Sequence, residues 1–82
     1  MDRESETTAA ILGLVREVLN KPTLGADQDV FDHGATSLSF VRILALVNER
    51  YGVMVPVAEL AGSATARSLA AHVVTAPTNI GA

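Results

Sequence analysis

Two stretches of the chain repeat apolar residues every three or four positions, and this spacing constrains the fold more than any other feature. An α-helix turns once in 3.6 residues, so the spacing places these side chains on one face. The pattern predicts helices over residues 8–20 and 37–51, and Gly52 ends the second. The predicted inward residues are Ile11, Leu12, Val15, Val18 and Leu19 in the first helix, and Phe40, Ile43, Leu44, Val47 and Tyr51 in the second, with Leu46 at its flank.

The segment between these two helices predicts a long structured loop. Residues 21–36 are interrupted by Pro22, Gly25, Gly34 and three aspartates, which favour turns over regular structure. Loops of this length in compact domains are usually functional or disordered. We expect the apolar side chains within it to anchor it on the core; they are Leu24, Val30 and Phe31.

The C-terminal third predicts two further helices. A short third helix is expected over residues 57–60, because Pro56 suits its start and Gly62 its end. Thr65 is the expected N-cap of a fourth helix over residues 66–74. Residues 53–55 are expected to be an extended connector and residues 77–82 a frayed tail. The sequence therefore predicts an all-α fold: a four-helix bundle of three longer helices and one short third helix, with the long loop between helices one and two.

Size and composition exclude several classes of function. The chain has 82 residues, which suffices for one domain over residues 1–82 with its core at about 8–74, and leaves little room for an enzyme active site. It has no cysteine and only two histidines, so we expect no disulfide and no metal site. The net charge of −3 is dispersed, which argues against nucleic-acid binding. A polar N-terminus and the lack of a long apolar run predict a cytoplasmic protein without membrane contact, and we expect a monomer.

Ser37 is the candidate functional residue. The turn-forming run Asp32-His33-Gly34-Ala35-Thr36 delivers it to the start of the second helix. Free backbone N–H groups and the helix dipole favour an anion there, so the hydroxyl could carry a phosphate ester. The alternative is that Ser37 only caps the helix, a role that Thr36 could also fill. A hydrolytic nucleophile is disfavoured because the sequence G-x-S-x-G is absent and His33 is a loop residue.

A second, narrower apolar strip begins one residue after Ser37. Leu38, Val41 and Ala45 repeat at helical spacing on a different side from the inward stripe. Two interpretations stay open. The strip is either buried by another helix, or it is a docking strip for partner proteins beside the candidate serine.

The run from Asp29 to Leu38 resembles the attachment motif of acyl and peptidyl carrier proteins, and the similarity extends over about residues 8–74, through Val55-Pro56-Val57 and Thr65-Ala66-Arg67-Ser68-Leu69-Ala70. The resemblance implies a right-handed four-helix bundle and a non-catalytic chain. It implies that Ser37 is esterified by 4'-phosphopantetheine from coenzyme A, whose thiol carries acyl or aminoacyl groups as thioesters. Asp32, Gly34 and Thr36 would support the motif, and partners would meet Leu38, Val41, Arg42 and Ala45.

The resemblance also implies a set of partners. These are a phosphopantetheinyl transferase, an adenylation or other loading enzyme, and condensation, ketosynthase, thioesterase or tailoring enzymes.

Fatty-acid-type carriers generally have an aspartate before the serine and an acidic second helix. Here Thr36 precedes the serine, and residues 37–51 hold two arginines and one glutamate, a net charge of +1. The pattern favours a peptidyl carrier of nonribosomal peptide assembly, with an acyl carrier of polyketide or fatty-acid-type synthesis as the alternative.

The sequence departs from the family pattern just before the predicted fourth helix. Ala61 and Ala64 replace a larger residue and a proline that are common in the family, and we expect a mobile third helix. Two functions of another class stay open: an unmodified helical adaptor that binds a partner through the second helix, and a regulatory phosphoprotein modified at Ser37. Met1 and the short tails favour a free-standing protein over an excised domain.

Overall fold

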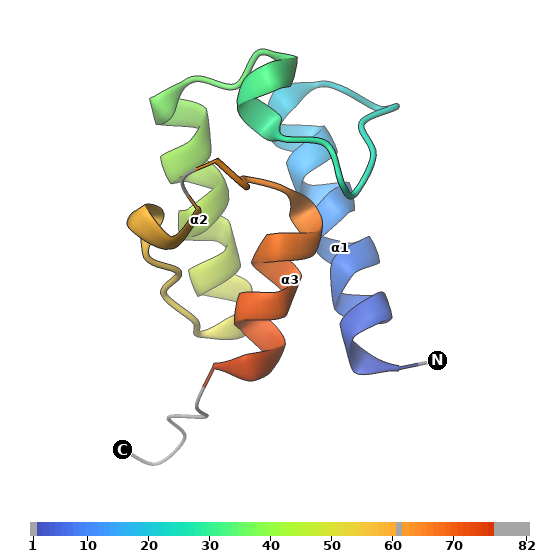
Figure 1. The fold of residues 1–82 in the computed structure, drawn as a ribbon, viewed down its shortest axis with the longest axis vertical. Helices are drawn as coiled ribbons and strands as arrows, with labels where there is room; N and C mark the ends of the chain where they lie inside the picture. Colours follow the sequence, from blue (N-terminus) through green and yellow to red (C-terminus); the bar gives the residue numbers. More distant parts are fainter. Residues whose placement is uncertain (1, 61, 77–82) are drawn as a thin grey trace.

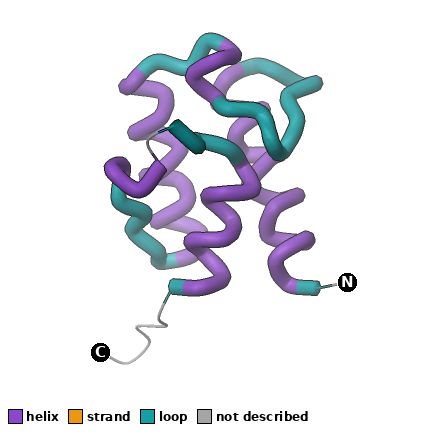
Figure 2. Tube along the Cα trace, in the orientation of Figure 1, coloured by secondary structure: helices purple, strands orange, loops and turns teal. Residues whose placement is uncertain are grey.

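The computed structural model of the chain describes residues 2–60 and 62–76, which form an all-α fold. Its three α-helices are α1 (Arg3–Leu19), α2 (Ser37–Tyr51) and α3 (Ala66–Thr75), and its two 3₁₀ helices are η1 (Val30–His33) and η2 (Val57–Leu60). In Figure 1, α1 and α2 lie on either side of α3, and the loop with η1 lies at the end of the molecule where α2 begins. Figure 2 shows helices and loops only in these residue ranges.

Helix α1 begins at Arg3, five residues before the predicted start. The Asp2 carboxylate caps it by accepting a hydrogen bond of 2.7 Å from the Ser5 N–H. Glu4 and Glu6 lie in the first turn, where the helix dipole favours negative charge. These polar residues precede the first apolar position, so a boundary drawn from apolar spacing was wrong. At the other end, Asn20 adopts a left-handed conformation with φ 56° and closes the helix.

Helix α2 has the predicted bounds, because both of its ends carry strong local signals. Thr36 is the N-cap, and Gly52 is the C-cap in the left-handed conformation with φ 68°. The Gly52 N–H donates to the Asn48 carbonyl at 2.8 Å. Glycine adopts a positive φ without the steric cost that a Cβ atom imposes, so the helix stops there.

The predicted short third helix is a single 3₁₀ turn, η2, so residues 2–60 and 62–76 contain three α-helices instead of four. The Glu59 N–H donates to the Pro56 carbonyl at 3.1 Å, which is the i to i+3 bond of a 3₁₀ turn. Four residues after a proline are too few to establish a ladder of α-helical bonds. Leu60 is buried and anchors the turn on the core.

The core lies between the three α-helices and is closed by the loop. Helix α1 packs against both α2 and α3. The fully buried larger side chains are Ile11, Val15, Val30, Ile43, Val47, Leu60 and Leu69. Leu24 and Val30 anchor the loop as predicted, but Phe31 is 46% exposed. The ring of Phe31 lies 5.0 Å from that of Phe40, centroid to centroid, so it covers the core edge from outside. No helix in the described part of the chain has the length and apolar character to span a membrane.

Helix α3 and the loop are held together by backbone hydrogen bonds. The Val30 N–H donates to the Ala64 carbonyl at 2.9 Å, and the Arg67 N–H donates to the Ala26 carbonyl at 3.0 Å. Thr65 caps α3, as predicted, by accepting from the Ser68 N–H. On the α1 side, Arg16 Nε donates to the Leu24 carbonyl at 2.7 Å. The loop is therefore fixed from two sides, and with it the start of α2. The predicted tail over residues 77–82 lies outside the described residues, as does Ala61.

Candidate functional site

Ser37 is the first residue of α2 and is exposed to solvent. The cap is made by its neighbours: Thr36 Oγ1 accepts from the Ser39 N–H at 3.1 Å, and Ser39 Oγ accepts from the Thr36 N–H at 2.9 Å. This reciprocal pair is a capping box. The Ser37 hydroxyl makes no hydrogen bond to any described residue, so the helix does not use it as a cap. The interpretation in which Ser37 only caps the helix is therefore wrong, because Thr36 is the N-cap.

The first turn of α2 also leaves donors beside the hydroxyl. The Phe40 N–H donates to the Thr36 carbonyl at 2.9 Å, which is the first bond of the helical ladder. The N–H groups of Ser37 and Leu38 precede that ladder and have no helical carbonyl to bond. Together with the positive end of the helix dipole, they make the surroundings of Ser37 favourable for an anion.

A glycine turn delivers the chain to Ser37. Gly34 has φ 96°, in the left-handed region, and follows η1. The Ala35 N–H donates to the Val30 carbonyl at 3.0 Å, which closes the turn. A Cβ at Gly34 would meet only Lys21 Cε at 3.8 Å, an ordinary contact. The glycine is therefore required by its backbone conformation and not by lack of space.

Asp29, and not Asp32, organises this turn through its side chain. Asp29 caps η1 by accepting from the Phe31 N–H at 2.8 Å through Oδ1. Its other oxygen accepts from the Ala64 N–H at 3.1 Å. Asp32 is exposed, and its carboxylate makes no hydrogen bond to a described residue. The family resemblance pointed to Asp32 as a motif residue, whereas the Ala64 partner of Asp29 is 35 residues away and gave no local signal in the sequence.

A second aspartate of the loop also reaches α3. Arg67 forms a two-point ion pair with Asp27, in which Nη2 lies 3.2 Å from Oδ2. The hydrogen bond from Arg67, with its charge, holds the pKa of Asp27 below its ordinary value of 3.8. No group of three or more His, Asp and Glu side chains in the described ranges lies close enough together to hold a metal ion.

The apolar strip next to Ser37 is open to solvent. Leu38 is 80% exposed and Val41 is 55% exposed, and Ala45 and Arg42 are also exposed. The interpretation in which another helix buries this strip is therefore wrong for the described part of the chain. A groove of about 480 Å³ follows the strip between α1 and α2. Its lining residues are Val18, Thr36, Leu38, Ser39, Val41, Arg42 and Ala45.

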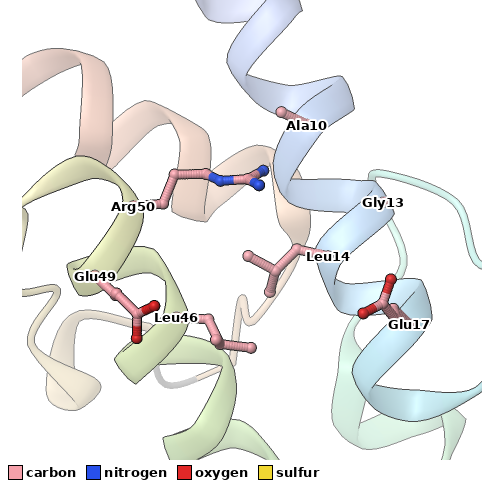
Figure 3. Close-up of a pocket in the computed structure, with 7 residues that line it drawn as sticks. All are labelled: Ala10, Gly13, Leu14, Glu17, Leu46, Glu49 and Arg50. Carbon is pink, nitrogen blue, oxygen red and sulfur yellow. The ribbon is translucent and has the colours of Figure 1, made fainter.

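A second groove between α1 and α2 lies further from Ser37. It has a volume of about 530 Å³ and is lined by Ala10, Gly13, Leu14, Glu17, Leu46, Glu49 and Arg50. Figure 3 shows Leu14 and Leu46 directed toward one another, and Glu17 and Glu49 on opposite helices. Leu46 is nine residues beyond Ser37, which is about 14 Å along a helix axis. This groove is therefore separate from the serine and has a more acidic rim.

Comparison with known proteins identifies the family. Residues 9–73 match the family described as phosphopantetheine attachment site, and the chain belongs to that family. Pyochelin synthetase PchF from two strains of Pseudomonas aeruginosa is 44% identical over 45 residues, which are 55% of this chain and 2% of the synthetase. Syringomycin synthase SyrB1 of Pseudomonas syringae pv. syringae is 35% identical over 69 residues, which are 84% of this chain and 11% of the synthase. The chain thus spans only a small part of these relatives. No solved structure gives a significant match.

The cofactor of this family is 4'-phosphopantetheine, attached covalently. The residues at the start of α2 fit such a group. Ser37 offers an exposed hydroxyl that is not used in the cap, and the free N–H groups of the first turn suit the phosphate.

Proposed function

We propose that the chain is a carrier protein and that Ser37 is its attachment residue. The observation that carries the proposal is the exposed Ser37 hydroxyl at the first position of α2, left free by the Thr36–Ser39 capping box. It lies inside the matched family region of residues 9–73. The neighbouring hydroxyls of Thr36 and Ser39 are both engaged in the cap.

Attachment is a transfer from coenzyme A that a separate transferase catalyses. The Ser37 oxygen bonds to the phosphorus of the phosphopantetheine half, the pyrophosphate bond breaks, adenosine 3',5'-bisphosphate leaves, and the hydroxyl proton passes to solvent. The role of this chain is to present the hydroxyl and to favour the negative phosphate through the first-turn N–H groups.

The carrier role follows from what the cofactor supplies and the protein lacks. The chain has no cysteine, and the bound cofactor supplies a thiol that holds acyl or aminoacyl groups as thioesters. A tether keeps the cargo at a high effective concentration near whichever enzyme is docked. The protein contributes the tether point and a recognition surface, and shuttles cargo between enzymes without catalysing a reaction.

We further propose that the cargo is an aminoacyl or peptidyl group in nonribosomal peptide assembly. Two of the relatives are named pyochelin synthetase and syringomycin synthase. The charge of α2 supports the same class: Arg42 and Arg50 against Glu49 give a net +1, so an electropositive partner gains little from this helix. The partners would be a phosphopantetheinyl transferase, an adenylation or other loading enzyme, and condensation or tailoring enzymes. An acyl carrier of polyketide synthesis is the alternative within the family.

The docking strip for these partners is the exposed one on α2. Leu38, Val41 and Ala45 offer an apolar contact directly beside Ser37, with Arg42 at its rim. Covering an exposed apolar side chain such as Leu38 removes apolar surface from water, which makes binding of a partner more favourable. Docking there brings the partner to the base of the tether.

Intact-protein mass spectrometry tests the attachment residue. The protein is incubated with coenzyme A, magnesium and a broad-specificity phosphopantetheinyl transferase, beside Ser37→Ala and Ser39→Ala. We expect a gain of one phosphopantetheine on the parent and on Ser39→Ala, the matched control two residues away, and none on Ser37→Ala. No gain on folded parent protein with several transferases would overturn the proposal and favour an unmodified adaptor, and a gain on Ser37→Ala would assign the site elsewhere.

A further inference from the structure

The groove along the exposed strip begins next to Ser37. Thr36 and Leu38, its two neighbours in the chain, both line this groove of about 480 Å³. The groove then continues along α2 as far as Ala45, eight residues beyond Ser37, which is about 12 Å along the helix axis. A flexible group attached to Ser37 therefore reaches the groove without crossing other surface.

The lining of the groove suits the chemistry of the prosthetic arm. Phosphopantetheine has two geminal methyl groups, two amides and a phosphate. Leu38 and Val41 are 80% and 55% exposed, and a methyl-bearing group that covers them removes apolar surface from water. Arg42 supplies donors for a phosphate or amide oxygen. Within the described residues, Arg42 forms no ion pair, so its guanidinium is available to a ligand.

The second groove is a poor site for the same arm. Its rim carries two carboxylates, Glu17 and Glu49, and one cation, Arg50, so its net charge is −1, whereas the groove beside Ser37 has Arg42 and no carboxylate among its lining residues. Its first lining residue on α2 is Leu46, which lies about 14 Å from Ser37 along the helix axis. The two grooves thus differ in both charge and distance from the attachment residue.

We propose that the phosphopantetheine arm of this chain rests in the groove along Leu38, Val41 and Ala45, with Arg42 bound to one of its oxygens. The inference rests on the proposed function, because it requires attachment at Ser37. In this resting state the arm covers the strip that partners use. A docking enzyme therefore displaces the arm, and the apo and holo proteins present different surfaces to their partners.

NMR spectra of the apo and holo proteins test the resting site, with intact mass confirming one phosphopantetheine per chain. We expect holo-minus-apo changes in the amide and methyl signals of Val41, Ala45 and Val18, and nuclear Overhauser contacts from the geminal methyl groups to Leu38 and Val41. Changes confined to residues 36–38, or contacts at Gly13 and Leu46, would overturn the inference while leaving the carrier function intact. A protein that gains no mass would instead overturn the proposed function.

Two pairs of variants separate the groove from general effects on the fold. Val41→Ser is compared with Val57→Ser, whose native side chain is equally exposed but lies outside the groove. Loss of apolar contact lowers the equilibrium constant for the resting arm about fivefold in Val41→Ser, and Val57→Ser leaves it unchanged. Arg42→Gln lowers it about twofold, and Arg50→Gln, on the same helix, does not. Equal signals at Ala45 in all four holo variants would overturn the inference.

Discussion

Asp29 links the loop to the segment before α3, and we predict that Asp29→Ala destabilises the protein far more than Asp32→Ala. The Asp29 carboxylate accepts from the Phe31 N–H at 2.8 Å and from the Ala64 N–H at 3.1 Å. The two aspartates are three residues apart, but Asp32 is exposed and its carboxylate bonds to no described residue. Asp32→Ala is therefore a matched control for the removal of a carboxylate from the same 3₁₀ turn.

The size of the effect follows from the two bonds that are lost. Each contributes about 1 kcal/mol net, so the free energy of unfolding falls by about 2 kcal/mol in Asp29→Ala. For a domain of this size, that corresponds to a decrease in Tm of about 10 °C. Asp32→Ala changes the free energy by less than about 0.5 kcal/mol. Asp29→Asn retains an oxygen that can accept one of the two bonds, so it lies between the alanine variant and the parent.

Denaturant and thermal unfolding followed by circular dichroism measure these differences. The transitions of the parent, Asp29→Ala, Asp29→Asn and Asp32→Ala are compared at one pH and salt concentration. Equal midpoints for the two alanine variants would refute the assignment of Asp29 as the link between loop and α3. A larger loss in Asp32→Ala would show that Asp32 organises the turn.

Three further predictions concern the site and its support. Thr36→Ala removes the cap of α2 and lowers the free energy of unfolding by about 1 kcal/mol, whereas Ser37→Ala changes it by less than about 0.5 kcal/mol. Urea unfolding measures both variants, and equal losses would mean that Ser37 also caps the helix. Gly34→Ala costs about 1 kcal/mol because φ is 96°, and an unchanged Tm would show that the turn relaxes. Because Arg67 holds the pKa of Asp27 below 3.8, the pair stabilises the folded state above that pH and its contribution is lost on acidification; a gap in Tm between parent and Asp27→Asn that persists well below pH 3.8 would contradict this.

Local signals in the sequence predicted the elements that depend on neighbours in the chain. The bounds of α2 follow from Thr36 and Gly52, and the buried face from residues such as Ile43 and Val47. The cap of α3 at Thr65 was predictable for the same reason. In contrast, the cap of α1 at Asp2 precedes any apolar repeat, so the predicted start at residue 8 was wrong.

Contacts between distant residues were not predictable from single-sequence patterns. The bond from the Ala64 N–H to Asp29 and the ion pair of Arg67 with Asp27 join segments 35 and 40 residues apart. Phe31 is apolar and was expected in the core, but it lies on the outside against Phe40. The exposure of Leu38 and Val41 likewise depends on which faces the other helices cover, and apolar spacing alone left it open.

The central claim, attachment at Ser37, is tested most directly by fragmentation mass spectrometry of the modified protein. Trypsin releases the segment from Glu17 to Arg42, because Pro22 protects the bond after Lys21, and this peptide contains Thr23, Thr36, Ser37 and Ser39 as hydroxyl candidates. The account predicts that fragments on either side of residue 37 place the added phosphopantetheine on Ser37 alone. Location of the group on Thr36 or Ser39, whose hydroxyls form the cap, would contradict the account.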